Sequence, residues 1–231
     1  MNTWKKVKII SSKLISPDVK SIIVTFPNLQ YKPGQCFDIR PLKYHSYRCY
    51  SIARTTKSTL EFGIQLLPGG EISSKLFDLK AGDNFEIRGP LGTNFVLNTK
   101  TLGDTILIGG GSGVVPLISM LKFLSKKSIQ THTQILISAK TKNDVLYKNE
   151  IDELVIENQN IQATYILTRA NNLAKRVDKN LLSKLISKHK THQPTCYIAG
   201  PTQFVENMML YLLQLGLTPQ QIRTEPFGDS E

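Results

Sequence analysis

The sequence predicts a two-part fold, an antiparallel β-barrel followed by a parallel α/β domain, on two observations. Up to about residue 96 the chain consists of short β-branched or aromatic segments separated by turn residues. Beyond about residue 99, apolar strand-like segments alternate with segments of helical spacing, which is typical of a parallel sheet covered by helices. We therefore predict two domains, 1–98 and 99–231.

The first half reads as short strands with one helix inserted. Turn residues such as Pro33-Gly34 and Gly69-Gly70 separate the strands, and their regular spacing predicts a small barrel. Apolar residues at helical spacing predict a helix over 72–79. The strand-like segments are 7–10, 21–26, 36–39 and 60–64.

The second half alternates between the two periods. Its predicted helices cover 114–123, 181–186 and 204–215, the last ending at Gly216. The predicted strands are 105–108, 134–138, 165–167 and 195–198.

The composition is that of a globular protein, with 40% hydrophobic and 20% charged residues. No apolar run approaches the roughly 20 residues that span a bilayer, and the N-terminus lacks the apolar core of a secretory signal. We therefore expect a cytoplasmic protein without a membrane span. The three cysteines form no CxxC pair, and the four histidines show no metal-ligand spacing. We expect no metal, and the odd cysteine count argues against a disulfide framework.

The formal net charge of +11 allows three interpretations. A basic surface that is simply solvated is the plainest. Nucleic-acid binding would require clustered Lys and Arg with interleaved aromatics, and the sequence shows no such cluster, so we expect no nucleic acid. A docking surface for an acidic protein partner is the third, because complementary charge raises association rates.

A glycine-rich turn follows the first strand of the second half. Glycines allow a sharp turn and close approach to a ligand, and the next helix offers free N–H groups to an anion. Pro116 suits an early helical turn. A pyrophosphate is the expected ligand, although the spacing is not GxGxxG and a purely structural turn is the alternative. The candidate binding residues are Gly110, Gly111, Ser112, Gly113 and Pro116.

The residues after the next two strands bear on the kind of nucleotide. The strand at 134–138 has no acid at its end to hold a ribose 2′-hydroxyl. The third strand ends in Thr168-Arg169, with Arg176 shortly after, and a hydroxyl with guanidinium groups suits a 2′-phosphate. This favours NADPH over NADH, and solvated loop side chains are the alternative.

A four-residue strand segment, Arg48-Cys49-Tyr50-Ser51, carries the candidate cofactor chemistry of the first half. Alternate residues of a strand share a face, so Arg48 and Tyr50 point the same way. The guanidinium suits a phosphate and the ring suits stacking, while Ser51 is a small donor for a ring nitrogen. A core tyrosine with polar neighbours is the alternative.

Six ordered motifs resemble the ferredoxin–NADP reductase superfamily, particularly its bacterial oxygenase-reductase and flavin-reductase-like branches. The resemblance spans essentially the whole chain. The motifs are Arg48-Cys49-Tyr50-Ser51, Gly69-Gly70-Glu71-Ile72-Ser73, Arg88-Gly89-Pro90-Leu91-Gly92, Gly109 to Pro116, Ala199-Gly200-Pro201 and Glu225-Pro226-Phe227. The third of these is similar to the family's barrel-closing turn.

The resemblance implies bound FAD, with FMN less favoured, and NADPH or NADH as co-substrate. It implies that Arg48 holds the flavin phosphate, that Tyr50 stacks on the isoalloxazine and that Ser51 lies near N5. Tyr50, Ser51 and Glu225 are the catalytic candidates, and a plain strand-end carboxylate is the alternative for Glu225. The further cofactor-binding candidates that it implies are Cys49, Gly70, Ile72, Ser73, Ser74, Ala199, Gly200, Pro201 and Phe227.

Two departures from the family pattern limit the resemblance. Ala199 replaces the family cysteine, and the chain has no cysteines for an attached iron–sulfur domain. The implied function is hydride transfer from NAD(P)H to bound FAD, followed by electron transfer to a separate, acidic carrier such as ferredoxin or flavodoxin. A reductase of free flavin and a non-catalytic nucleotide-binding electron-transfer subunit are the alternatives.

Overall fold

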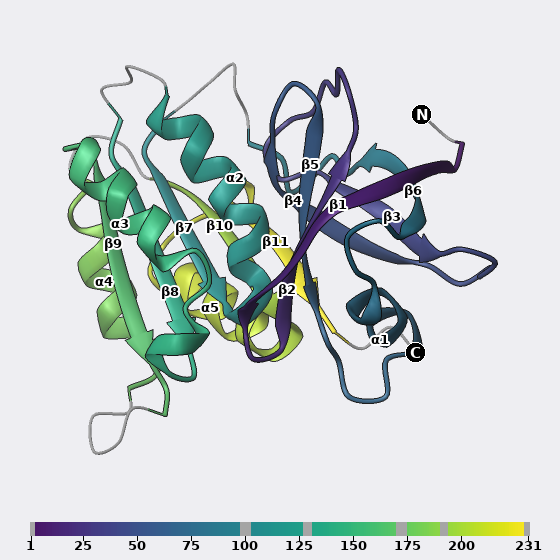
Figure 1. Cartoon of the computed structure of the whole chain (residues 1–231). Helices are drawn as coiled ribbons and strands as arrows, with labels where there is room; N and C mark the ends of the chain where they lie inside the picture. The colour runs from purple at the N-terminus through teal and green to yellow at the C-terminus, as the bar shows by residue number, and fades with distance from the viewer. Residues whose placement is uncertain (1–2, 98–102, 127–130, 170–174, 190–193, 229–231) are drawn as a thin grey trace. The chain divides into compact units, whose positions relative to one another are not determined.

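The computed structural model describes residues 3–97, 103–126, 131–169, 175–189 and 194–228. The chain divides into two compact units, residues 1–96 and 97–231. Figure 1 follows the chain through both units. The predicted boundary at 98/99 lies outside the described residues and stays a prediction. No helix in the described ranges is long and apolar enough to cross a membrane.

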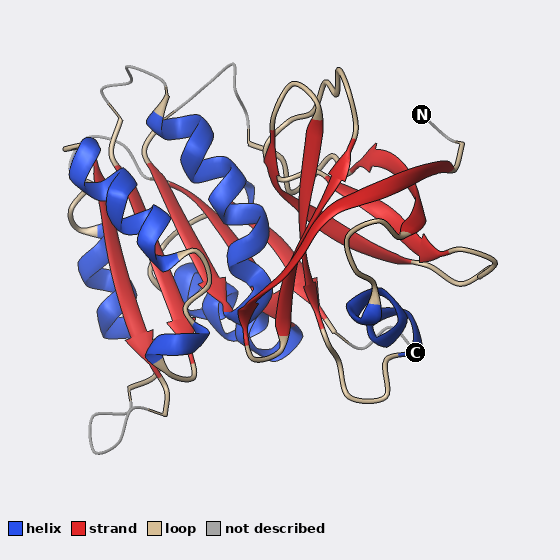
Figure 2. Cartoon of the chain, viewed as in Figure 1, coloured by secondary structure: helices blue, strands red, loops and turns tan. Residues whose placement is uncertain are grey.

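The first unit is a closed antiparallel barrel, as the sequence predicts (Figure 2). Its strand order is β1-β2-β5-β4-β3-β6, and one helix, α1 (Glu71–Asp78), follows β5. Pairing of Lys5–Lys8 in β1 with Asn84–Ile87 in β6 closes the ring. The strands are β1 (Lys5–Ser16), β2 (Val19–Thr25), β3 (Cys36–Pro41), β4 (Arg48–Thr55), β5 (Thr59–Gln65) and β6 (Asn84–Leu91).

β6 departs from the sequence-based expectation, because Gly89 and Pro90, expected in a barrel-closing turn, lie within the strand. A Cβ atom at Gly89 would lie 2.7 Å from the ring of Phe37. The glycine lets the strand run close against the barrel core, and the Gly-Pro pair therefore continues the strand.

Three phenylalanines pack edge to face inside the barrel. The ring of Phe37 lies 5.8 Å from that of Phe26 and 5.9 Å from that of Phe62, centroid to centroid. Ile72 and Leu76 of α1 belong to the same apolar cluster, so the helix is anchored on the barrel. Burial of such side chains contributes about 1.5–3 kcal/mol each.

The second unit is a parallel five-stranded sheet with strand order β11-β10-β7-β8-β9. Helices cover both faces, with α2 and α3 on one side and α4 and α5 on the other (Figure 1). The strands are β7 (Thr105–Gly110), β8 (Thr133–Ala139), β9 (Ile161–Leu167), β10 (Thr195–Pro201) and β11 (Ile222–Phe227). The helices are α2 (Val114–Ser125), α3 (Lys148–Glu157), α4 (Lys179–Ile186) and α5 (Thr202–Gln214), with short 3-10 turns at Gly111–Gly113, Lys142–Asp144 and Pro219–Gln221.

Two elements of this unit were absent from the sequence-based expectation. In α3 only Ile151 is fully buried, so its apolar stripe is too weak to show a helical period. β11 is the edge strand of the sheet and carries Glu225 and Pro226 among its six residues. The composition of β11 is poor for a strand, so its pairing with β10 decides its conformation.

The cysteines correct the expectation that no disulfide forms. Cys36 in β3 and Cys49 in β4 are bonded, with their Cα atoms 6.2 Å apart, and the free Cys196 is buried in β10. Adjacent antiparallel strands place Asp38 opposite Cys49 and Ser51 opposite Cys36, so the two cysteines stand diagonally across the pair. The cysteine count alone carries no information on this strand pairing.

A buried polar cluster lies at the amino end of the parallel strands. His189 Nδ1 lies 2.8 Å from Asp104 Oδ2, and the His132 N–H donates to Asp104 Oδ1 at 2.9 Å. The Gln134 amide nitrogen donates to the Leu185 carbonyl at 3.1 Å and lies 2.9 Å from His189 Nε2. Both ring nitrogens of His189 thus lie within hydrogen-bond distance of a polar partner.

This cluster makes stability depend on pH. Burial raises the pKa of Asp104, but the hydrogen bonds from His189 and the His132 N–H outweigh it and hold the pKa below 3.8. Such a carboxylate contributes stability that is complete above its unfolded-state pKa and is lost as pH falls through the lower folded-state value. We expect Asp104→Asn to cost about 1 kcal/mol at neutral pH.

The measurement is urea unfolding between about pH 6 and about pH 3, where the stability of Asp104→Asn should fall less steeply than that of the wild type. Glu153→Gln, which removes the same charge from an exposed position, serves as the control. Equal pH slopes for the wild type and Asp104→Asn would contradict the prediction.

Candidate functional site

β4 presents Arg48 and Tyr50, two residues apart, on one face. Arg48 is exposed, and its Nη1 donates to the Tyr47 carbonyl at 2.9 Å. Tyr50 is half-buried against the barrel core. Burial raises the pKa of Tyr50 to about 12, against the opposing effect of the Arg48 charge, so the hydroxyl stays neutral near pH 7. The strand thus sets a cation beside a neutral aromatic ring.

The next two positions of interest on β4 alternate with this pair. Cys49 is exposed and bonded to Cys36, and Ser51 is buried opposite Cys36 in the strand register. The sequence-based roles of both residues toward a cofactor stay predictions.

The loop before α1 is held by Ser73. Its hydroxyl donates to the Gly70 carbonyl at 3.1 Å and accepts from the Leu67 N–H at 3.3 Å. Gly70 is the N-cap and carries no capping side chain, so the first-turn N–H groups are not satisfied by such a cap. Ile72 is buried, whereas Ser74 is partly exposed and its N–H donates to the Gly70 carbonyl at 3.0 Å. The backbone of this turn suits an anion.

The fold brings these two segments together. α1 packs against β3 and β5, and β4 lies between those two strands in the barrel. Ile72 belongs to the apolar cluster on which Tyr50 packs. We call residues 48–51 with 70–74 the barrel half-site.

The glycine-rich turn after β7 makes backbone contact with the last residues of β10. A Cβ atom at Gly113 would lie 2.0 Å from the Ala199 carbonyl oxygen, and one at Gly200 would lie 2.8 Å from the Gly110 carbonyl oxygen. Gly111 has φ +54, which favours glycine, and Pro116 is buried at the third position of α2. Ser112 is partly exposed between them. The glycine-rich turn is therefore held against the end of β10.

The remaining candidates of the second unit meet at the same, carboxyl edge of the sheet. Ala199 lies opposite Gly109 on one side and Glu225 on the other, and Pro201 lies opposite Phe227. Glu225 and Phe227 are partly exposed. We call residues 110–116, 168–169, 176, 199–201 and 225–227 the sheet half-site.

The basic residues after β9 lie at this edge as well. The N–H groups of Thr168 and Arg169 donate to the carbonyls of Ala139 and Lys140 at 2.9 and 2.8 Å. The Lys175 N–H returns to the Leu167 carbonyl at 3.0 Å, which brings exposed Arg176 back to the end of β9. These backbone hydrogen bonds thus fix the backbone positions of Arg169 and Arg176 at the end of β9.

One contact of the sheet half-site was missed from the sequence. A Cβ atom at Gly110 would lie 2.8 Å from the ring of Phe204, in the first turn of α5. The ring packs on the glycine turn across a wide sequence separation, so no local pattern indicates it.

Comparison with known proteins identifies both units. The oxidoreductase FAD-binding domain family matches residues 6–95, and the oxidoreductase NAD-binding domain family matches residues 107–209. The chain belongs to the ferredoxin–NADP reductase superfamily. The pairing of these two oxidoreductase domains is the architecture of a nicotinamide-dependent flavoprotein reductase of that superfamily.

Several relatives share this superfamily architecture. A flavodoxin/ferredoxin–NADP reductase of Buchnera aphidicola subsp. Baizongia pistaciae is 29% identical, over 98% of this chain and 96% of that protein. A Ralstonia sp. ferredoxin–NAD(P)(+) reductase component of naphthalene 1,2-dioxygenase/salicylate 5-hydroxylase systems is 25% identical, over 87% of this chain. The chain spans 62% of that component and 44% of a Gordonia propane 2-monooxygenase reductase component.

Solved structures show the same fold. An Amycolatopsis cytochrome P450 reductase has a TM-score of 0.85 at 20% identity, covering 98% of this chain and 71% of its own. A Neisseria gonorrhoeae ferredoxin NADP+ reductase has a TM-score of 0.83 at 19% identity, covering 98% and 99%.

The contact at Gly113 generates a prediction. Gly113→Ala forces the β7–α2 turn away from the end of β10, because the added Cβ would meet the Ala199 carbonyl. We expect a loss of about 2 kcal/mol or more in the free energy of unfolding, measured in urea. Gly103→Ala has open space around its Cβ and should change stability little. A fully stable Gly113→Ala would show that the turn and the end of β10 are not in contact.

Proposed function

We propose that the chain oxidises NAD(P)H and passes the electrons through bound FAD to a separate carrier protein, with ferredoxin or flavodoxin as the preferred class. The observation that carries the proposal is the pairing on β4 of exposed Arg48 with the neutral, half-buried ring of Tyr50. A dinucleotide flavin presents this pair of groups, an anionic phosphate and a flat ring. The match of residues 6–95 to an FAD-binding domain family supports it.

The barrel half-site fits a flavin nucleotide by the chemistry of its donors. The Arg48 guanidinium binds a phosphate, the Tyr50 ring stacks on the isoalloxazine, and Ser51 lies near a ring nitrogen. The first turn of α1, with Gly70, Ile72, Ser73 and Ser74, binds the second phosphate through backbone N–H groups. Two phosphate-binding groups favour FAD, which carries two phosphates, over FMN, which carries one. The bound flavin supplies the acceptance of a hydride and the release of electrons one at a time.

The sheet half-site fits a nicotinamide dinucleotide. The backbone of residues 110–113 and the N-terminus of α2 bind the pyrophosphate, and Ala199, Gly200 and Pro201 border the nicotinamide. Glu225 orients the nicotinamide or handles a proton there, and Phe227 is a further cofactor contact at the same edge of the sheet. The match of residues 107–209 to an NAD-binding domain family supports this assignment.

The preferred nucleotide in this proposal is NADPH. The described end of β8 continues into Lys140 and Lys142 and contributes no acid, while Thr168, Arg169 and Arg176 lie at the end of β9. A 2′-phosphate pairs with guanidinium groups, whereas a free 2′-hydroxyl calls for a carboxylate.

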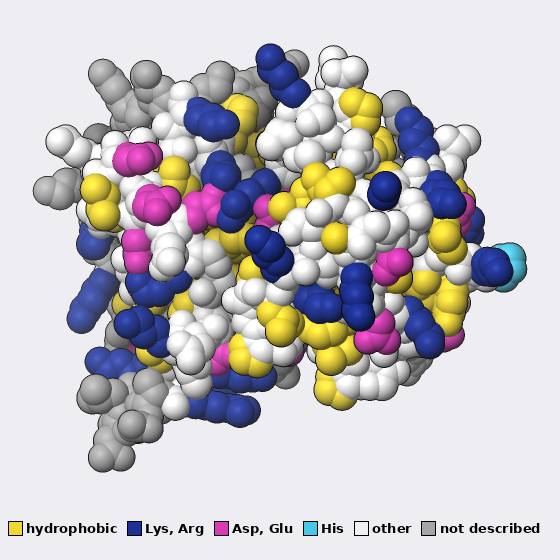
Figure 3. Space-filling view, in the orientation of Figure 1, with side chains coloured by type: hydrophobic (Ala, Val, Ile, Leu, Met, Phe, Trp, Pro, Cys, Tyr) yellow, Lys and Arg dark blue, Asp and Glu magenta, His cyan; other side chains and the backbone are white. Residues whose placement is uncertain are grey.

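The proposed partner is an acidic carrier protein. Lys and Arg side chains are scattered over the face drawn in Figure 3, and the net charge is +11. Long-range attraction of this kind speeds the encounter with an acidic protein and weakens as salt is added. A cytoplasmic location stays a prediction.

The decisive experiment is an absorbance spectrum of the purified chain supplemented with FAD, followed by anaerobic titration with NADPH. We expect retained flavin absorbance that bleaches on addition of the nucleotide. Because Arg48 is the proposed phosphate ligand, Arg48→Ala should weaken FAD binding about ten- to a hundredfold.

The control for this loss of charge is Lys57→Ala, at an exposed position on the turn before β5. It should bind FAD like the wild type. A chain that neither binds FAD nor oxidises NADPH would refute the proposal, and flavin that is turned over without being retained would make free flavin the substrate.

Nucleotide preference gives a separate prediction. Arg169→Ala should raise the KM for NADPH about tenfold and leave that for NADH nearly unchanged, because only NADPH carries the 2′-phosphate. Lys126→Ala, at the C-terminal end of α2, removes a charge away from that phosphate and should alter neither KM. Steady-state rates with each nucleotide measure this, and equal effects of Arg169→Ala on both would contradict it.

A further inference from the structure

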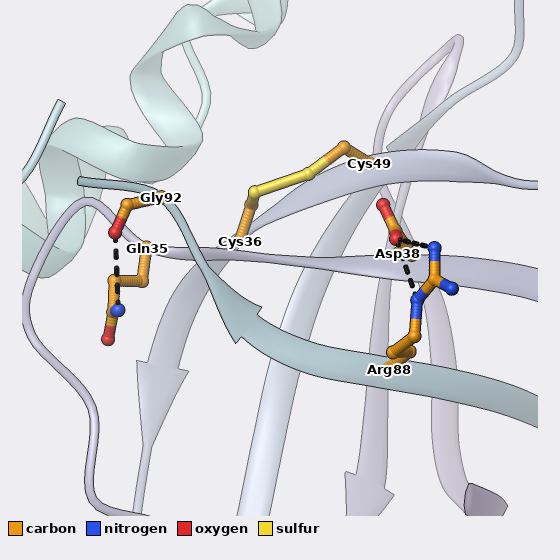
Figure 4. The surroundings of a disulfide bond; sticks show 6 residues. All are labelled: Gln35, Cys36, Asp38, Cys49, Arg88 and Gly92. Atoms are coloured by element: carbon orange, nitrogen blue, oxygen red, sulfur yellow. Dashed lines mark hydrogen bonds and ion pairs between the residues drawn. A yellow bond between two sulfur atoms is a disulfide. The ribbon is translucent and has the colours of Figure 1, made fainter. Parts of the chain in front are cut away.

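The bonded cysteines stand at an accessible place on the barrel. Cys49 is exposed and Cys36 is partly exposed, on neighbouring strands β4 and β3 (Figure 4). The third cysteine contrasts with them. Cys196 is fully buried in β10, and burial raises the pKa of its thiol to about 12, so it stays protonated and unreactive.

The bond involves the strand segment of the barrel half-site. Cys49 stands between Arg48 and Tyr50, and its partner Cys36 precedes Phe37, which lies opposite Tyr50. β3 and β4 are paired over only four positions, from Cys36 with Ser51 to Ile39 with Arg48. The disulfide crosses this short ladder diagonally and is its one covalent link.

An attacking thiolate is negatively charged, so the charges near Cys49 bear on thiol exchange there. The carboxylate opposite Cys49, Asp38, is paired with Arg88 at 2.6 and 3.1 Å, so its negative charge is compensated (Figure 4). The strand opposite Cys49 therefore presents no uncompensated negative charge to repel an incoming thiolate.

We propose that Cys36 and Cys49 are a redox-active pair that dithiols open, and that opening weakens retention of the flavin by residues 48–51. The second half rests on the proposed FAD binding. An incoming dithiol thiolate attacks Cys49 Sγ, and Cys36 leaves as a thiolate that takes a proton from water. The second thiol of the dithiol then closes its own disulfide, releases Cys49, and completes a two-electron reduction.

Flavin retention depends on the bond because the strand pair is short. With the link intact, Arg48 and Tyr50 are held in the register that Phe37 and Ile39 set. Opening the disulfide lets the β4 segment fluctuate relative to β3. FAD binding must then order this segment again, and that ordering reduces the binding free energy. We expect FAD affinity to fall about three- to tenfold on reduction.

The first test counts thiols by mass in the full chain. After oxidation by oxidised glutathione, a denatured sample should add one alkyl group, and digestion should yield a linked peptide containing Cys36 and Cys49. After dithiothreitol under native conditions, alkylation should add two groups, at Cys36 and Cys49, and spare buried Cys196. Absence of the linked peptide, or a bond that native dithiothreitol does not open, overturns the proposal.

The second test measures FAD affinity by flavin fluorescence in both states. The wild type should bind FAD more weakly when reduced, whereas Cys36→Ser should show the weaker affinity in both states and no response to dithiothreitol. Cys196→Ala should behave as the wild type. Equal affinity of the wild type in both states overturns this proposal alone, while no FAD binding in either state overturns the proposed function together with it.

Discussion

At the carboxyl edge of the parallel sheet, the turn after β7 and the end of β10 approach so closely that no side chain fits between them. Gly113 meets the Ala199 carbonyl, and Gly200 meets the Gly110 carbonyl. This contact fixes the start of α2 relative to β10, and through β10 it fixes β11 with Glu225. The sheet half-site depends on it, because donors aimed at an anion are effective only when they are held in place before the ligand arrives.

In the barrel, the core and the barrel half-site share residues. Tyr50 packs on the cluster that contains Phe37 and Ile72, so the interior that stabilises the barrel also orients the ring and the first turn of α1. Arg48 lies at the outer end of the same strand and stays exposed. Interior packing therefore sets the geometry, and the exposed end of the strand supplies the charge.

The sequence predicted those features that depend on local pattern. Period-two and helical spacing gave the order of barrel and α/β sheet, and strand alternation put Arg48 and Tyr50 on one face. The features that were missed depend on tertiary pairing. Gly89 and Pro90 lie within β6, and α3 has a single fully buried residue, Ile151. Cys36 and Cys49 form a disulfide bond between β3 and β4. Neither composition nor periodicity encodes which segments become neighbours.

Closure of the barrel by β1 and β6 has a consequence for the order of assembly. Lys5 in β1 pairs with Ile87 in β6, so the barrel closes only after β6 has been synthesised. A nascent chain that has emerged only as far as β5 holds β1 with one free edge, and a free edge invites pairing with another chain. Release of the β6 segment from the ribosome is then the event that seals the barrel and removes that hazard.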